Sequence, residues 1–488
     1  MIMALIAAAI AFGFAVMLAK EFVARRRPYT ALWALALLLY GVASLVVVIG
    51  AVGGWTKLEY EIYWALGAVL TVPLLAAGEV VLLFRDRVVL WVTVLLLVFT
   101  EETRPERPTP LDEVRAGLHI FEQSLFDVTA TVYEHCLLAL RRACTTGPHG
   151  LPLIGIGDWN DGMNRVGVEG RGESVWLGWF LTATLRAFAS IAETRADADA
   201  AADLRAKADA YASAVHEHGW DGAWYRRAYF DDGTALGSSQ NEECRIDSIA
   251  QSWSVISGAG DPERQRTAMR SLETHLVRED EGLILLLTPP FDKSPMDPGY
   301  IKGYLPGVRE NGAQYTHAAL WAVQATALLG DGDRALTLYQ MINPLTRARD
   351  AAGVAKYKVE PYVVAGDVYS AEGQHGRGGW TWYTGSASWM YRVGLETILG
   401  FTKRGDTLRI EPRVPKHWTE YAIEYRHGAS VYAIAVRHAS DGPGAPRVTL
   451  DGRALEGAEI ALVDDGHRHE VVVTYSLSAS NQSVSALG

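Results

Sequence analysis

The stretch DWNDGMN at positions 158–164 places two carboxylates, one indole and two amides within seven residues. Glycines on both sides let the backbone bend sharply, so we expect a loop rather than the interior of a helix or strand. Indoles stack on pyranose faces, amides bind hydroxyls, and a carboxylic acid can protonate a glycosidic oxygen. The composition fits a sugar-binding loop. It also fits an acidic surface turn in which Asp and Asn cap their own backbone, which is the commoner use of these residues.

Two further segments carry side chains of the same kind. YLPGVRENG at 304–312 leads into a predicted helix that bears His317, and HGRGGWTWY at 375–383 ends at Thr384-Gly385, just before another predicted helix. Amides at the start of a helix attract anions. An ordinary N-cap at Thr384 explains the same turn, and a lone histidine is more often a packed core side chain than a ligand.

The bulk composition narrows the class of protein. At 488 residues the chain has room for two or three domains. Its net charge of −11 and its isoelectric point near 5.7 argue against a nucleic-acid partner. Three cysteines are too few and too scattered for a disulfide framework or a zinc site. We therefore expect no metal.

The first hundred residues differ from the rest, because they are dominated by long apolar runs. Each of three runs has about the 20 residues that a helix needs to cross a bilayer: Ile2–Leu18, Ala31–Trp55 and Ile62–Phe84. A fourth run, Val88–Thr100, is short for a span. The sequence therefore predicts a transmembrane segment of three or four helices over residues 1–100.

Basic residues between the runs predict the orientation. Arg25–Arg27 follow the first run, and Arg85 and Arg87 follow the third. The positive-inside rule places both of these loops in the cytoplasm. With three spans the rest of the chain then stays in the cytoplasm, whereas with four spans it is exported. We favour three spans, and hence a cytoplasmic catalytic domain on a bacterial-type inner membrane.

Residues 101–110 are charged and proline-rich, which is typical of a linker. Beyond them, apolar residues at helical spacing predict a mainly helical region over 111–400. The expected helices are 133–143, 175–191, 196–218, 246–257, 264–276, 313–329, 333–341 and 386–399. Buried helices alternate with amphipathic ones, a pattern that indicates a helical toroid with a loop-built face.

After residue 400 the apolar pattern changes to period two, which predicts a β-sandwich over 401–478 and a disordered tail over 479–488. The expected strands are 408–410, 421–425, 430–436, 447–450, 460–463 and 470–475. Asp-Gly pairs at 441, 451 and 465 are predicted turns between them.

Three of these segments together resemble a known family. GLPLIGIGDWNDGMNRVGVEGRGESVWLGWF at 150–180, RENGAQYTHAALW at 309–321 and GGWTWYTGSASWMYRVGLE at 378–396 are similar to the inverting β-glycoside phosphorylases typified by cellobiose and chitobiose phosphorylase. They most resemble the phosphorylase-like carboxy-terminal region of cyclic β-1,2-glucan synthases. The resemblance implies an (α/α)6 toroid followed by a β-sandwich, and activity on β-glucan oligosaccharides or polysaccharides.

The resemblance also implies roles for individual residues. Asp161 would be the general acid, and Trp159 would line the sugar subsite beside it. Glu310 would bind sugar hydroxyls, with Tyr304 nearby. His317 and the Thr384-Gly385 turn would hold inorganic phosphate, which is a co-substrate, so no cofactor is expected.

Two neighbours of Asp161 are expected to support it. An amide such as that of Asn160 suits a sugar hydroxyl, and Asp158 is a second candidate for contact with the substrate. A carboxylic acid that protonates a leaving oxygen near neutral pH needs a raised pKa, which the adjacent charge of Asp158 and partial burial would supply.

The chain departs from the family in the part that precedes residues 158–164, the segment that we call the acid loop. A complete member has an amino-terminal β-sandwich and a full ring of helices there, whereas this chain has membrane spans and only 111–144. Three hypotheses therefore remain. They are a membrane-anchored phosphorylase-type module, an inverting hydrolase with Glu310 as base, and a non-catalytic remnant. The incomplete ring would expose apolar surface, which a partner chain would cover.

Overall fold

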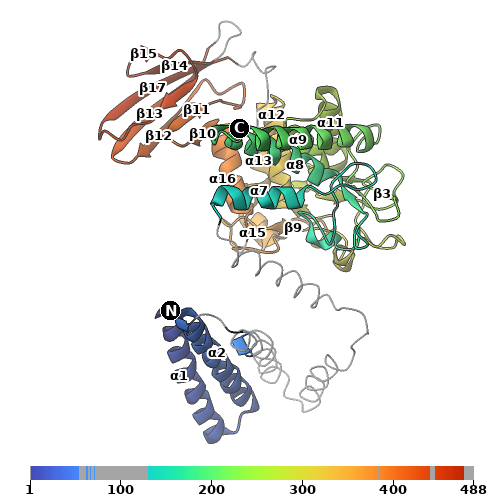
Figure 1. Ribbon diagram of the computed structural model, residues 1–488, viewed down its shortest axis with the longest axis vertical. Helices are drawn as coiled ribbons and strands as arrows, with labels where there is room; N and C mark the ends of the chain where they lie inside the picture. Colours follow the sequence, from blue (N-terminus) through green and yellow to red (C-terminus); the bar gives the residue numbers. More distant parts are fainter. Residues whose placement is uncertain are drawn as a thin grey trace. The chain divides into compact units, whose positions relative to one another are not determined.

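The computed structural model describes residues 2–53, 56, 62–63, 66, 71, 130–382, 384–439 and 446–476. The chain divides into two compact units, Met1–Ala130 and Thr131–Gly488. Each unit has its own internal packing, and Figure 1 shows the elements of both.

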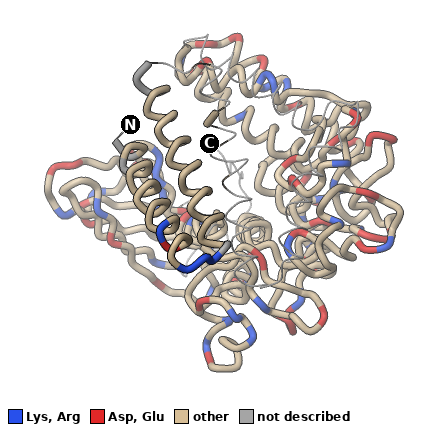
Figure 2. Tube along the Cα trace, turned by 90° about the horizontal axis from the view of Figure 1, so that it is seen from below, with Lys and Arg blue, Asp and Glu red and all other residues tan. Residues whose placement is uncertain are grey.

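The first unit contains two long apolar helices, α1 (Ile2–Arg25) and α2 (Pro28–Gly53), packed against each other. Small residues let them approach closely. Ala11 and Ala36 are buried, and a Cβ on Gly41 would lie 2.8 Å from the Phe12 ring. Figure 2 shows both helices almost free of charge, with basic residues where they connect.

Stretches of both helices, Ala7–Arg25 and Tyr29–Gly50, are long and apolar enough to cross a membrane. They correspond to the first two predicted spans. The third predicted span has only four of its residues among those described, and the fourth span and the linker at 101–110 lie outside the described residues.

The second unit begins with helices at nearly every predicted position. Their bounds are α7 Val132–Ala143, α8 Val175–Thr194, α9 Ala198–His218, α10 Ser248–Ile256, α11 Pro262–Leu276, α12 Thr316–Leu328, α13 Gly332–Ile342, α14 Pro344–Arg347, α15 Ala351–Tyr357 and α16 Ser386–Arg392, which continues as a π-helical segment, η4, Val393–Ile398. Only α14 and α15 were not predicted.

The helices pack in neighbouring pairs. α8 contacts α9 and α10, α10 contacts α11 and α12, and α12 contacts α13 and α16. Tryptophans form the core between them, with Trp253 and Trp321 in edge-to-face contact 5.2 Å apart. α8 is also apolar and long enough to cross a membrane. Its inner side chains are instead buried against neighbouring helices: Trp179 is fully buried in this core, and Leu185 is fully buried in a second cluster with residues of α9.

Very short strands and turns tie the loops to the helix starts. β1 (Glu173–Ser174), β4 (Ile246–Asp247) and β8 (Gln314–Tyr315) directly precede α8, α10 and α12. Their partners are β2 Ala228–Tyr229, β7 Leu287–Thr288 and β9 Asp367–Val368. β3 (Ala235–Leu236) pairs with the other side of β2, and β5 (Val277–Arg278) pairs with β6 (Leu283–Ile284). Two 3-10 turns, η2 (Asp161–Met163) and η3 (Tyr300–Gly303), contact each other. The loops are therefore fixed by local pairing rather than free.

The C-terminal region forms two sheets. One has the order β10 (Phe401–Arg404), β11 (Thr407–Ile410), β16 (Glu459–Ala461). The other has the order β12 (Glu420–His427), β13 (Ser430–His438), β17 (Arg468–Tyr475), β14 (Arg447–Leu450), β15 (Arg453–Ala454), with β13 and β17 parallel. Figure 1 shows β10 beside α16.

Alternate residues of these strands form an apolar core, as the period of two predicted. Ile434 and Val436 of β13 are buried together with Leu408 and Ile410 of β11. The six predicted strands are confirmed, while β10 and β15 were not predicted. The turn at Asp441 and the tail at 479–488 lie outside the described residues.

A histidine in the larger sheet makes its stability depend on pH. His469 lies between Asp451 and Asp465, with ring nitrogens 2.9 and 3.1 Å from their carboxylates. The bond to Asp451 and the contact with Asp465 raise the pKa of His469 against the opposing effect of burial. A raised pKa contributes stability that is present below the ordinary value near 6.5 and is lost as the pH rises through the folded-state value.

We therefore expect the thermal unfolding temperature of this unit to decrease as the pH is raised from 6 to 8. This decrease should be smaller in His469→Gln. The matched control is His417→Gln, since the His417 side chain is 75% exposed and its nearest carboxylate is 4.0 Å away. Identical pH profiles for wild type and His469→Gln would show that this contact contributes nothing.

Candidate active site

A cavity of about 180 Å³ lies at the starts of α12 and α16. It is lined by Arg309, Tyr315, His317, Gly366, Asp367, Trp380, Thr384, Gly385 and Ser386. His317, Thr384 and Gly385, which the sequence assigned to one phosphate site, thus share one cavity.

His317 lies in the first turn of α12 among three indoles. Its ring is 4.4 Å from that of Trp321, 5.3 Å from that of Trp389 and 5.4 Å from that of Trp159. Burial lowers the pKa of His317 to about 4, so its imidazole is neutral near pH 7. Its Nε2 has no hydrogen-bond partner among the described residues, which leaves it available to a bound group.

The turn before α16 makes the N-cap contact that its sequence allowed, and it also lines the cavity. The Thr384 hydroxyl accepts a hydrogen bond from the Ser386 amide at 3.1 Å, as an N-cap does. Gly385, at the helix start, provides no capping side chain. Backbone atoms and one hydroxyl of this turn therefore line the cavity. Together they form a small polar wall that suits oxygen-rich ligands.

Arg309 is a cavity residue that the sequence reasoning missed. Its guanidinium carbon lies 5.4 Å from the ring centroid of Tyr304 and 5.7 Å from that of Trp380, and its Nε is 3.4 Å from Glu310. Its φ of 51° is unusual for a residue other than glycine. Its position directly before Glu310 in the RENG motif was the available signal.

Asp367 also lines the cavity, but its carboxylate is hydrogen-bonded to backbone amides. Its two carboxylate oxygens accept hydrogen bonds from the amides of Trp380 at 3.0 Å and Arg309 at 3.1 Å. Burial raises the pKa of Asp367, and the two amides and the Arg309 charge oppose that rise. Asp367 therefore joins the two walls of the cavity, and Arg309 is the cation that offsets its charge.

The acid loop is held in a tight turn that exposes Asp161. Asn160 caps η2 by accepting a hydrogen bond from the Gly162 amide at 3.1 Å, and Asp161 opens the turn with its side chain exposed. The Asn164 side chain accepts a hydrogen bond from the amide of Tyr300 at 3.1 Å, which ties η2 to η3. Burial and a hydrogen bond to Asp161 raise the pKa of the Tyr300 phenol.

A series of contacts connects the acid loop to the cavity. Trp159, two residues before Asp161, meets the rings of Tyr315 at 5.3 Å and His317 at 5.4 Å, both edge-to-face. Buried Glu310 interacts with Tyr315, whose pKa burial and the Glu310 charge raise to about 12. Trp159, Glu310 and Tyr304 therefore lie around one region, which also holds the predicted phosphate residues.

Asp158 was expected to contact the substrate, and the structure corrects this. Its side chain is fully buried and receives two hydrogen bonds of 2.6 Å from Arg227 and one of 2.6 Å from Ser174. Burial alone would raise its pKa, but Arg227 outweighs burial and holds the pKa below its usual value. Asp158 therefore has no free oxygen for a sugar, and its charge is paired with that of Arg227.

Asn160 is likewise less available than expected. Its side chain is buried, and its oxygen is committed to the cap of η2. Only its Nδ2, which has no partner among the residues described, is left to bind another group. The nearness of Asn160 to Asp161 in sequence thus reflects turn geometry more than contact with a ligand.

A buried ion cluster underlies the loop. Arg227 is fully buried, and its Nε also lies 3.3 Å from Asp247, though without the alignment of a hydrogen bond. Asp247 caps α10, and Ser174 caps α8. Burial, partly opposed by Arg227, raises the pKa of Asp247 to about 6. One cation thus joins the acid loop to the starts of two core helices.

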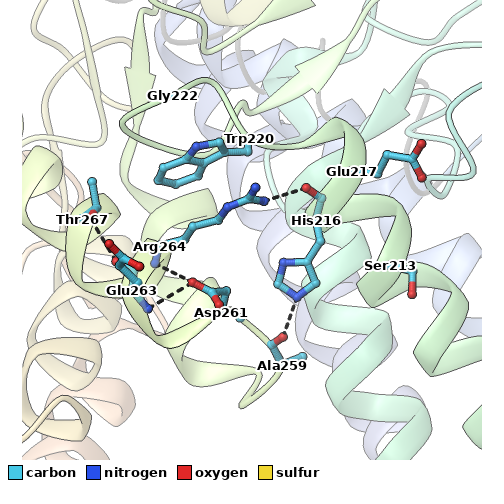
Figure 3. Close-up of a pocket in the computed structure, with 11 residues that line it drawn as sticks. Ser213, His216, Glu217, Trp220, Gly222, Ala259, Asp261, Glu263, Arg264 and Thr267 are labelled. Atoms are coloured by element: carbon cyan, nitrogen blue, oxygen red, sulfur yellow. Dashed lines mark hydrogen bonds between the residues drawn. The ribbon is translucent and has the colours of Figure 1, made fainter.

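A second, larger hollow of about 950 Å³ lies between the end of α9 and the start of α11. In Figure 3 the Arg264 side chain lies against the Trp220 ring and donates a hydrogen bond to the His216 carbonyl. Its guanidinium carbon is 5.2 Å from the ring centroid, and the hydrogen bond is 2.7 Å long. Asp261 is occupied by the amides of Glu263 and Arg264. The hollow contains none of the predicted site residues, and Arg264 lies against the Trp220 ring, so the smaller cavity is the candidate site.

Comparison with known proteins is consistent with this geometry. Residues 118–400 match the family described as the Glycosyl hydrolase 94 superfamily, catalytic domain. The chain belongs to this family. It is 49% identical to the cyclic beta-(1,2)-glucan synthase NdvB of Rhizobium meliloti over 69% of this chain and 12% of that protein.

Phosphorylases are related at greater distance. The chain is 33% identical to solabiose phosphorylase of Paenibacillus borealis over 70% of this chain and 44% of that enzyme. It is 31% identical to N,N'-diacetylchitobiose phosphorylase of Vibrio furnissii over 67% of this chain and 40% of that enzyme. The chain thus spans less than half the length of these relatives, and it contains a glycoside phosphorylase-like module.

Loss of the central cation should destabilise the second unit. Arg227→Met leaves buried Asp158 without its partner and is expected to cost about 3–5 kcal/mol of unfolding free energy in urea titrations. The double variant Asp158→Asn/Arg227→Met should lose less than the sum of the single variants.

The matched control is Arg165→Met, because the pair of Arg165 with Asp297 is also 2.6 Å long but 62% and 51% exposed. It should cost only about 0–1 kcal/mol. Equal losses in Arg165→Met and Arg227→Met would contradict a special role of the buried cluster.

Proposed function

We propose that this chain is a membrane-anchored glycoside phosphorylase-type module that cleaves β-1,2-linked glucan with inorganic phosphate, as a part of a cyclic glucan synthase. The observation that carries the proposal is the shared cavity of His317, Thr384 and Gly385, with Trp159 of the acid loop packed on the His317 ring. Similarity to a glucan synthase and to phosphorylases supports the substrate class.

The proposed reaction needs one acid and one phosphate cradle. Phosphate, bound by the His317 ring nitrogen, Arg309 and the Thr384-Gly385 turn, attacks the anomeric carbon. The bond from this carbon to the glycosidic oxygen breaks on the opposite face, and Asp161 gives that oxygen its proton. The proton that hydrogen phosphate loses on forming the ester restores Asp161 over the turnover. The product is an α-configured sugar 1-phosphate and a glucan shorter by one unit.

The neutral state of His317 suits this role. A neutral imidazole can donate one hydrogen bond to phosphate without a prior protonation step. The charge needed for the anion then comes from Arg309, which must also offset Asp367 in the same cavity. Tyr300 is hydrogen-bonded to Asp161 and is therefore suited to hold the acid in position until the sugar binds.

We also infer the larger architecture from the family. Helices over 111–400 would form part of an (α/α)6 toroid, which is supported by the sequence of neighbouring pairs from α8 to α16. The two C-terminal sheets would form a β-sandwich against it. α1 and α2 would anchor the chain in the membrane, with Arg25–Arg27 on the cytoplasmic side.

An inverting hydrolase is the main alternative, and one observation weighs against it. Such an enzyme needs a second carboxylate free to activate water. Glu310 is buried, lies 3.4 Å from Arg309 and interacts with Tyr315. Its carboxylate is therefore committed to neighbouring side chains, whereas phosphate requires no base.

The direct test is incubation of the purified chain with short β-1,2-glucan and inorganic phosphate. We expect α-glucose 1-phosphate, with no product when phosphate is omitted. Asp161→Asn should lower kcat by about 10²–10⁴-fold while sugar binding persists. Release of phosphate-free sugar would favour the hydrolase, and unchanged behaviour of Asp161→Asn would favour a non-catalytic remnant.

Removal of the imidazole should weaken phosphate binding selectively. His317→Ala is expected to raise the KM for phosphate about tenfold or more, because it removes a hydrogen bond to a charged ligand, with a smaller change in the KM for glucan. His375→Ala is the control, since His375 does not line the cavity. An unchanged KM for phosphate in His317→Ala would argue against the assigned cradle.

A further inference from the structure

Exposed aromatic side chains border the candidate active-site cavity on two adjoining segments. Tyr362 is 67% exposed, Trp380 is 55% exposed and Trp382 is 64% exposed. The segments 360–366 and 380–382 lie side by side, because the Gly366 amide donates a hydrogen bond of 2.6 Å to the Trp380 carbonyl. We call these three aromatic residues the aromatic rim.

The rim lies at the edge of the cavity rather than elsewhere on the surface. Gly366 on one segment, Trp380 on the other and nearby Thr384 all line the cavity. In the sequence Trp382 is two residues from each of two cavity-lining residues, Trp380 and Thr384. A group that extends out of the cavity past this wall would meet the rim first.

Trp382 is held in an unfavourable backbone conformation. Its φ is 65°, a region that bulky side chains rarely adopt. Its indole N–H donates a hydrogen bond of 2.8 Å to Glu360 on the other segment, which fixes the ring across the two segments. Strain of this kind persists where the surroundings enforce it and is concentrated at ligand-binding sites.

Core packing does not account for the rim, since most of each ring faces solvent. Large exposed aromatic rings that are fixed in place make good platforms for ligands with an apolar face and polar edges. A pyranose is such a ligand. The three rim side chains themselves carry no charge, which suits a neutral glucan.

We propose that the aromatic rim binds sugar units of a β-glucan outside the cavity, so that this site acts on oligomers longer than a disaccharide. This inference rests on the proposed function and assigns the length class of its substrate. A cavity of about 180 Å³ is smaller than a usual ligand site, which fits a bound chain that lies partly outside it.

The test compares a disaccharide with a long chain. Phosphorolysis of the β-1,2-linked disaccharide and of a long linear β-1,2-glucan is measured for wild type, Trp382→Ala and Tyr362→Ala. We expect kcat/KM for the long glucan to fall about three- to tenfold in each variant, with the disaccharide value unchanged. Tyr391→Ala is the matched control, because Tyr391 is 69% exposed on α16 and does not line the cavity.

Retardation in a native gel that contains β-1,2-glucan gives a readout independent of turnover. Wild type and Tyr391→Ala should be retarded, and Trp382→Ala and Tyr362→Ala less so. If the wild type turns over neither substrate but the gel still shows weaker retardation of the two rim variants, the proposed function is wrong, whereas glucan binding by the rim is supported. Equal losses on both substrates, or full retardation of both rim variants, would overturn the rim.

Discussion

The site depends on a buried cation, Arg227, that two buried carboxylates share. Asp158 belongs to the acid loop, and Asp247 caps the core helix α10. A charge without a partner in this interior would be strongly destabilising, so the three groups hold the loop and the helix start together. Asp161 can be exposed and still well positioned, because the residues beneath it are fixed.

In the cavity beside this loop, the positive charge and the neutral hydrogen-bonding ring come from different residues. Burial among indoles lowers the pKa of His317 and keeps the imidazole neutral near pH 7, while Arg309 carries the positive charge among aromatic rings. Asp367 links both walls through backbone amides. An anion would thus meet one cation, one neutral ring and a helix start, a combination that suits phosphate better than activated water.

Most of the helices and strands were predictable, because each is long enough to show its own period. α8, α9 and α13 match the predicted ranges within a few residues. The two-residue strands β1, β4 and β8 have no period to detect, although they fix the loops to the helix starts. The short helices α14 and α15 were missed for the same reason.

The sequence by itself determined the family, the helical and strand regions and the segments that meet at the site, because these are carried by local patterns and motifs. Only the tertiary structure decided which acid of the loop is exposed. Asp158 and Asp161 are equivalent by composition, but Arg227, 69 residues away, takes the first into the core. Burial and long-range pairing separate two like residues, and neither is visible in local sequence.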